Sequence, residues 1–200
     1  MLNRYARQFF GALFYPVARL LLRWGLSPDA VTIIGTLGVS FGALIFYPLG
    51  ELFWGTVFIT CFVFSDIIDG LMARISGRSS AYGSFLDSTL DRIQDGAVFL
   101  GLTVWFFTGG EDPWMGSAAV VCLFLGTQVS YVRAKAESLG YCADRGIAER
   151  PERMVFTLVF TGFTGLGLPS VVLFIVLVTL SLASLVTIGQ RMAAVARQRT

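Results

Sequence analysis

Long apolar stretches, separated by short polar links, run through most of the chain. Several of these stretches approach the roughly 20 residues that a helix needs to cross a bilayer. The pattern predicts six membrane-spanning helices, near residues 29–48, 52–75, 81–108, 115–139, 152–167 and 169–195. Because the links between them are short, we expect the stretch 29–195 to form one helical bundle.

The N-terminal segment follows a different pattern, in which arginines alternate with large apolar residues. Arg4, Arg7, Arg19 and Arg23 are interspersed with phenylalanines and leucines. This is typical of a basic amphipathic helix that lies on the membrane surface, so we assign residues 1–25 to a juxtamembrane helix. The sequence therefore predicts an all-α membrane protein with a single domain, 1–200, made of this helix and six transmembrane helices.

Composition agrees with this picture and adds an orientation. The 200 residues are 55% hydrophobic and 14% charged, which leaves little room for a soluble domain. The net charge of +2 identifies no partner, and we expect membrane lipids rather than nucleic acid. The links near 48–52, 109–114 and 165–169 contain no Lys or Arg. By the positive-inside rule, both termini and the other links face the cytoplasm, which predicts a multi-pass plasma-membrane protein.

Four aspartates carry the strongest chemical signal. Asp66 and Asp69 share one face of the second predicted span, and Asp87 and Asp91 share one face of the third. The short link 76–80 makes these two helices antiparallel neighbours, so the four carboxylates can converge at their cytoplasmic ends. This places the candidate active site on the cytoplasmic side.

Carboxylates near hydrocarbon are costly and are usually functional. Two divalent cations would offset four negative charges, and the oxygen ligands suit Mg²⁺ or Mn²⁺; the chain has no His. The alternative is that the aspartates only pair with Arg74, Arg78 and Arg92. Asp95, one turn further along, is a candidate outer partner or a partner of Arg92 rather than a metal ligand.

The complete segment resembles the signature of the CDP-alcohol phosphatidyltransferase family. It reads Asp66-x2-Asp69-Gly70-x2-Ala73-Arg74-x8-Gly83-x3-Asp87-x3-Asp91. Members of that family transfer the phosphatidyl group of a CDP-lipid to an alcohol and release CMP. The resemblance implies that Asp66, Asp69, Asp87 and Asp91 bind two Mg²⁺ ions, with Mn²⁺ as the other candidate, and that Asp91 is the general base. It also implies a homodimer.

The same resemblance assigns a CDP-lipid site. The start of the first span, Pro28-Asp29-Ala30-Val31-Thr32, is similar to an element with which the family binds the nucleotide, although Asp29 and Thr32 also suit a helix start. Gly70 would allow close approach of the nucleotide, and Arg74 would reach the diphosphate. The residues assigned to CDP-diacylglycerol are Asp29, Ala30, Val31, Thr32, Gly70, Arg74 and Ser80.

A basic cluster suggests that the acceptor alcohol carries a phosphate. The expected ligands of that phosphate are Ser130, Arg133, Lys135, Arg153 and Arg191, with membrane anchoring as the alternative role of the cations. The segments 130–137 and 149–153 are similar to those of the actinobacterial branch of the family that uses inositol phosphate (1D-myo-inositol 3-phosphate). The branch that uses glycerol 3-phosphate is the alternative.

A small divalent-metal transporter is the alternative from a different class, with intramembrane carboxylates lining an ion path. The clustering of the aspartates at one end of two helices argues against it, because the outer halves of the predicted spans carry few polar residues. An assay of CMP distinguishes the two hypotheses. The transferase should release CMP when CDP-lipid is added, whereas the transporter should carry metal without releasing CMP.

Overall fold

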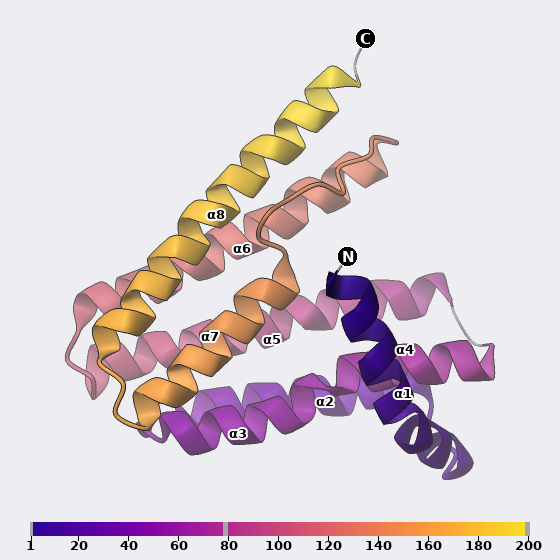
Figure 1. The fold of residues 1–200 in the computed structure, drawn as a ribbon, viewed down its shortest axis with the longest axis horizontal. Helices are drawn as coiled ribbons and strands as arrows, with labels where there is room; N and C mark the ends of the chain where they lie inside the picture. The colour runs from indigo at the N-terminus through magenta and orange to yellow at the C-terminus, as the bar shows by residue number, and fades with distance from the viewer. Residues whose placement is uncertain (1, 78–79, 199–200) are drawn as a thin grey trace. The chain divides into compact units, whose positions relative to one another are not determined.

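The computed structural model describes residues 2–77 and 80–198, and it describes side chains from residue 11 on, except residue 12. Over this part of the chain its secondary structure consists of α-helices joined by links (Figure 1). The helices are α1 (Leu2–Arg23), α2 (Pro28–Phe46), α3 (Leu52–Val63), α4 (Ser65–Ser76), α5 (Ala81–Thr108), α6 (Pro113–Ser138), α7 (Arg150–Gly165) and α8 (Ser170–Arg197). The all-α prediction is confirmed.

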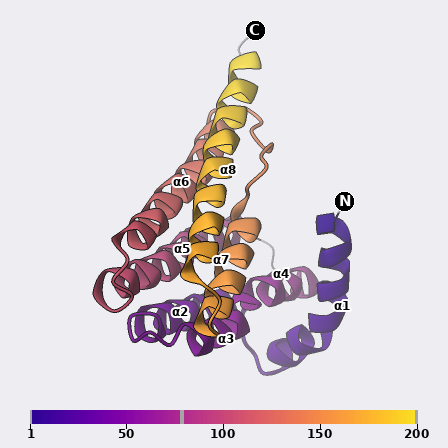
Figure 2. The same ribbon diagram turned by 60° about the vertical axis from the view of Figure 1, so that its left-hand side comes forward.

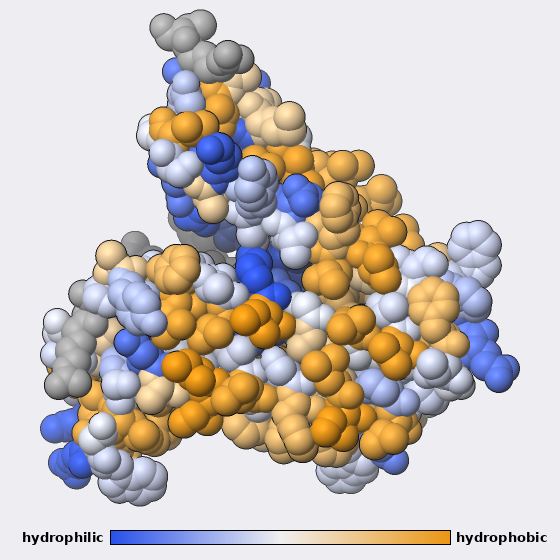
Figure 3. Space-filling view, turned by 180° about the vertical axis from the view of Figure 1, so that it is seen from behind, coloured by the Kyte–Doolittle hydropathy of each residue, from blue (hydrophilic) through white to orange (hydrophobic). Residues whose placement is uncertain are grey.

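Four helical segments are long and apolar enough to cross a membrane. They are Pro28–Phe46, Leu52–Ser76, Pro113–Ser138 and Ser170–Arg197. Apolar side chains cover much of the surface drawn in Figure 3, as expected for helices whose solvent is lipid. The chain is therefore a membrane protein. Helices α5 and α7, which also correspond to predicted spans, are not among the four: α5 carries the signature aspartates, and α7 has 16 residues.

Contacts divide the chain into two compact units. The first combines the residues up to Gly42 with Phe58–Gln94, and the second combines Ala43–Val57 with the residues from Asp95 on. In the first unit α1 packs against α4, as Figures 1 and 2 both show. Ala18, Val31 and Met72 form the buried centre of this packing. The start of α2 and the whole of α4 are thereby held in one unit.

Helix α2 also packs closely against α3 and α4 within the first unit. A side chain at Gly35 would collide with Ser65, and one at Gly38 would collide with the ring of Phe62. Small residues permit this close approach of helix backbones. The predicted span near 52–75 corresponds to the segment Leu52–Ser76, which is divided at Phe64 into α3 and α4. The backbone N–H of Ile67 donates to Phe64 O at 3.1 Å, a tight three-residue turn that separates α3 from α4.

In the second unit α6 and α8 run side by side, and α7 packs against α8 (Figures 1 and 2). The segment between α6 and α7 is fastened to α8. Thr187 Oγ1 accepts hydrogen bonds from the backbone N–H groups of Ile147, at 3.2 Å, and Ala148, at 3.1 Å. Gln198 pairs with the backbone N–H and C=O of Cys142 at 2.9 and 2.7 Å. Because α8 fixes this segment, it also fixes where α7 begins.

Candidate active site

A polar pocket of about 270 Å³ opens in the first unit, between the starts of α2 and α5 and the middle of α4. It brings together most of the residues that the sequence assigned to the metal and the CDP-lipid. Its lining consists of Pro28, Asp29, Thr32, Asp66, Asp69, Gly70, Ala73, Ser80, Gly83, Ser84 and Asp87.

Two helix N-termini face this pocket, and each is capped by a serine. Ser27 Oγ accepts from the backbone N–H of Ala30 at 3.2 Å, at the start of α2. Ser80 Oγ accepts from the N–H of Gly83 at 2.9 Å, at the start of α5. Helix N-termini carry partial positive charge and exposed N–H groups, which suit phosphate. Ser80 therefore has a structural role as a cap, in addition to its place in the pocket lining.

The aspartates of α4 are oriented by Thr32, which the sequence assigned to the CDP-lipid, and by Gln94, which the sequence did not single out. Thr32 Oγ1 donates to Asp69 Oδ2 at 2.6 Å, and the Asp69 residue is only 6% exposed. Gln94 Nε2 lies 3.3 Å from Asp66 Oδ1 and donates to Thr36 Oγ1 at 3.1 Å. Gln94 is fully buried and follows Asp87 by two helical turns on α5. Because residues seven apart lie on the same face of a helix, this spacing could have identified Gln94 from the sequence.

The chemistry of the lining suits a divalent cation. Four carboxylates line the pocket, from Asp29, Asp66, Asp69 and Asp87, and the lining includes neither Lys nor Arg. The carboxylates do not form a finished cage: within the part of the chain described, no three Asp, Glu, His or Cys side chains are close enough together to hold a metal ion. Coordination would require rotation of aspartate side chains about χ1 and χ2, which have several staggered or broad wells.

Several residues assigned to this site lie outside the pocket lining. Asp91 is one turn beyond Asp87 on α5, and its Oδ2 lies 3.8 Å from Arg92 Nη2. Arg74 is exposed, and its Nε donates to Gly70 O at 2.9 Å, so it extends along α4 at the edge of the pocket. Val31 is buried in the packing of α1 against α4, and Ala30 takes part through its backbone N–H in the helix cap.

The second unit contains an ion-pair cluster at the start of α7. Asp95 Oδ1 accepts from Arg150 Nε at 3.0 Å, and Asp95 Oδ2 lies 3.5 Å from Arg153 Nη2. The side chains of Asp95 and Arg153 are 6% and 2% exposed. Asp95 therefore pairs with two arginines of α7. Arg150 is a further member that the sequence assignment omitted, although it lies in the segment 149–153 that resembles the actinobacterial branch of the family.

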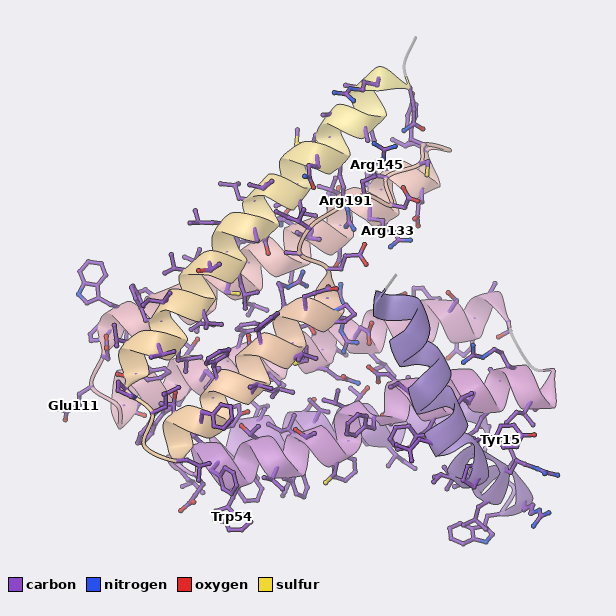
Figure 4. The ribbon with its side chains drawn as sticks, in the orientation of Figure 1. Tyr15, Trp54, Glu111, Arg133, Arg145 and Arg191 are labelled. Atoms are coloured by element: carbon purple, nitrogen blue, oxygen red, sulfur yellow. The ribbon has the colours of Figure 1, made fainter. Side chains whose placement is uncertain are left out.

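Arg191 is buried beside the same cluster. Its Nε donates to Arg145 O at 3.0 Å, its Nη1 to Val129 O at 2.6 Å, and its Nη2 lies 3.4 Å from Glu149 Oε1. Within this unit, Arg133, Arg145 and Arg191 lie at one end of α6 and α8, and Glu111 lies at the other end (Figure 4).

The remaining acceptor residues lie on α6. Arg133 Nε pairs with Glu137 Oε1 at 2.8 Å, and Arg191 interacts electrostatically with both Arg133 and Arg153. Ser130 Oγ donates to Gly126 O at 3.4 Å, and Lys135 is exposed. The structure thus groups three of the predicted cations, with Arg153 and Arg191 buried and Arg133 exposed.

Comparison with known proteins identifies the family of the chain. The sequence model of the CDP-alcohol phosphatidyltransferase family matches residues 25–182. The chain is 50% identical to the phosphatidylinositol phosphate synthase of Streptomyces avermitilis over 204 residues, covering 99% of this chain and 84% of the relative. It is 43% identical to the enzyme of the same name from Mycolicibacterium smegmatis over 192 residues, covering 94% and 86%.

Solved structures are also similar. The crystal structure of Mycobacterium tuberculosis phosphatidylinositol phosphate synthase with CDP-DAG bound matches with a TM-score of 0.85 and 41% identity, covering 90% of this chain and 92% of that one. A structure of the same protein with manganese and citrate matches with a TM-score of 0.84 and 40% identity, covering 90% and 87%. These relatives are enzymes, which favours the transferase over the transporter. The chain belongs to the CDP-alcohol phosphatidyltransferase family.

Proposed function

We propose that this enzyme transfers the phosphatidyl group of CDP-diacylglycerol to inositol phosphate, giving phosphatidylinositol phosphate and CMP. One observation carries the proposal. The signature residues Asp66, Asp69 and Asp87 line a single pocket that also contains Asp29 and Ser80 at two helix N-termini. Helix N-termini and a divalent cation both stabilise the negative charge of a diphosphate. In this pocket the starts of α2 and α5 provide the N-termini, and the aspartates would hold the cation. The relatives named phosphatidylinositol phosphate synthase support the choice of acceptor.

In this proposal the pocket holds the CDP group. The N-termini of α2 and α5 direct N–H groups toward the phosphates, while Gly70 leaves room on α4: a side chain there would meet nothing within 4 Å. Asp66, Asp69, Asp87 and Asp91 would hold one or two Mg²⁺ or Mn²⁺ ions, which supply positive charge to the diphosphate as CMP leaves. The manganese complex of the M. tuberculosis relative supports a divalent ion of this kind.

Asp91 is the proposed general base. A carboxylate within hydrogen-bond reach of the acceptor hydroxyl can remove its proton as the oxygen attacks the β-phosphorus of CDP-diacylglycerol. The bond from that phosphorus to the CMP phosphate oxygen breaks, so the acceptor gains the phosphatidyl group in one displacement. Asp91 lies outside the pocket lining and on the same helix as Asp87, consistent with a group that serves the acceptor rather than the nucleotide.

The phosphate of the acceptor is assigned to the buried arginines of the second unit. Arg153 and Arg191 present planar guanidinium groups, which suit phosphate better than Lys does. Ser130, Arg133 and Lys135 on α6 complete the proposed set. A glycerol 3-phosphate acceptor would use the same cations, so the identity of the polyol is a separate question that the acceptor panel described in the Discussion decides.

Arg153→Ala and Arg191→Ala should each raise the acceptor KM about ten- to a hundred-fold, because a charge-assisted hydrogen bond is worth ~1.5–3 kcal/mol. The KM for CDP-diacylglycerol should change little, since these residues are assigned to the acceptor only. The measurement is steady-state kinetics with inositol phosphate and with glycerol 3-phosphate.

Arg145→Ala is the matched control for these variants. Arg145 contributes its backbone carbonyl, not its side chain, to the hydrogen bond with Arg191, so the substitution leaves that bond in place. Its acceptor KM should equal that of the wild type. If Arg153→Ala and Arg191→Ala also keep wild-type kinetics, these arginines anchor helices and do not bind the acceptor.

We also propose that α5 and α7 span the membrane together with the four most apolar segments, and that the enzyme is a plasma-membrane homodimer with a cytoplasmic active site. The distribution of basic residues supports the six-span topology, because both termini then lie on the cytoplasmic side. The family resemblance supports the dimer. Helix α1 would lie on the cytoplasmic surface, with its arginines near lipid head groups.

The topology predicts that position 111 is outside the cell and Cys142 inside. Glu111 lies just before Asp112, whose side chain caps α6, so Glu111→Cys leaves the cap intact. Cys142 is a natural exposed cysteine and serves as the internal comparison. In intact cells, a membrane-impermeant maleimide should label a single-cysteine variant at 111 and spare one that retains only Cys142. Labelling at 111 only after permeabilisation would contradict the six-span arrangement.

The enzyme class is tested by product release. Purified protein in detergent should release CMP from CDP-diacylglycerol when inositol phosphate and Mg²⁺ or Mn²⁺ are present, and chelation of the metal should stop the reaction. The same protein in liposomes should not conduct Mn²⁺. Metal flux without CMP release would instead establish the transporter.

A further inference from the structure

The cluster at the start of α7 contains a carboxylate that the proposed reaction does not use. Asp95 lies on α5, and its two oxygens are divided between two arginines, Arg150 at 3.0 Å and Arg153 at 3.5 Å. All three belong to the second unit. A carboxylate that is 6% exposed is costly to bury, and this one is held in place by two cations from another helix.

Arg153 is held from a second side as well. A side chain at Gly126 of α6 would come within 2.7 Å of Arg153 Nε and 3.0 Å of its Cζ. The guanidinium therefore rests on the backbone of α6 while Asp95 pairs with it from α5. Buried in this way, its 2% exposed side chain has little freedom to move.

The cluster brings arginines from two helices together. Its buried or partly buried members include the cations Arg150, Arg153 and Arg191 and the anions Asp95 and Glu149. Guanidinium groups gathered in this way suit an anion with several acceptor oxygens, such as a phosphate monoester. Without Asp95, Arg150 and Arg153 would lose the group that holds them together.

We infer that Asp95 is a positioning residue for the acceptor phosphate: it fixes the guanidinium of Arg153 against α6 and keeps Arg150 beside it. The inference rests on the proposed function, since it assumes that Arg153 binds the phosphate of the acceptor. Asp95 does not touch the substrate. It acts through the arginines, which is why its loss should affect acceptor binding and not the use of CDP-diacylglycerol.

Asp95→Asn tests this directly, because asparagine keeps the shape of the side chain and removes its charge. The acceptor KM should rise about ten- to a hundred-fold, while kcat and the KM for CDP-diacylglycerol stay within about twofold. Calorimetric titration of inositol phosphate, with no CDP-diacylglycerol present, should show the same weakening. Gly126→Ala provides a second route: it displaces Arg153 without altering any charge, so it should raise the acceptor KM too, even if Asp95→Asn does not fold.

Glu152→Ala is the structural control, because it removes the side chain that completes the capping box with Glu149 at the start of α7. The loss of this cap should lower the thermal stability and leave the acceptor KM unchanged. If it raises that KM as much as Asp95→Asn does, the effect belongs to the helix start and the inference is wrong. An unchanged or lowered acceptor KM in Asp95→Asn, or parallel losses in kcat and in both KM values, would also overturn it.

The choice of acceptor by the wild-type enzyme shows whether a failed prediction concerns the role of Asp95 or the proposed function. If the enzyme makes lipid only from glycerol 3-phosphate, the acceptor assignment is wrong, and the same variants measured with glycerol 3-phosphate decide the role of Asp95. If it neither uses nor binds a phosphorylated acceptor, both the acceptor site and the role of Asp95 are rejected.

Discussion

Asp69→Asn should abolish turnover. Asp69 is the most deeply placed carboxylate of the pocket, and in the proposed mechanism it helps hold the metal that offsets charge on the diphosphate. Loss of about 4 kcal/mol of such stabilisation lowers the rate roughly a thousand-fold. Asp66→Asn and Asp87→Asn should behave alike. The measurements are CMP release from CDP-diacylglycerol and titration of the purified variants with Mn²⁺, whose binding should weaken.

Thr32→Val is the control that distinguishes the effect of losing the Asp69 carboxylate from the effect of losing the hydrogen bond that orients it. It removes the 2.6 Å hydrogen bond to Asp69 and leaves the carboxylate in place. Its activity should fall about tenfold, the loss of one good hydrogen bond, and metal should still bind. If Asp69→Asn retains more than a tenth of the wild-type rate, the pocket is not the catalytic metal site.

Asp91→Asn should also abolish turnover, with a different signature. An amide cannot accept the proton of the acceptor hydroxyl, so the chemical step is lost. Binding of CDP-diacylglycerol should remain close to that of the wild type, because Asp91 does not line the nucleotide pocket. The comparison requires two measurements on each variant, CMP release and equilibrium binding of CDP-diacylglycerol.

The contrast with Asp69→Asn makes this prediction specific. Asp69→Asn should weaken both metal and CDP-lipid binding, whereas Asp91→Asn should lose the reaction alone. Wild-type activity in Asp91→Asn would remove this residue from the mechanism, and lost CDP-lipid binding would show that its main role is to hold the metal rather than to act as the base.

Much of the first unit could be predicted from the sequence because its chemistry is local. Asp66 and Asp69 lie one turn apart on α4, Asp87 and Asp91 one turn apart on α5, and a five-residue link joins the two helices. Helix periodicity and a short link are enough to bring three of these four carboxylates to one pocket. Ser27 likewise marked the start of α2 through its capping side chain.

The second unit depends on contacts between residues far apart in the sequence, which periodicity cannot supply. Asp95 and Arg150 are separated by 55 residues, and Val129 and Arg191 by 62. The sequence placed Arg153 and Arg191 in an acceptor site by their charge, but it could not reveal that Asp95 and Glu149 pair with them. The boundary between α3 and α4 at Phe64 was similarly hidden, because no Gly or Pro lies beside it to signal the end of a helix.

The identity of the lipid product tests the central claim most directly. Purified enzyme is given CDP-diacylglycerol, Mg²⁺ or Mn²⁺, and in separate reactions inositol phosphate, glycerol 3-phosphate, free inositol or serine. The lipids are then identified by mass spectrometry. The account predicts phosphatidylinositol phosphate, with CMP formed in equal amount, at the highest kcat/KM for inositol phosphate. Phosphatidylglycerophosphate as the preferred product, or a product from free inositol or serine at comparable kcat/KM, would contradict it.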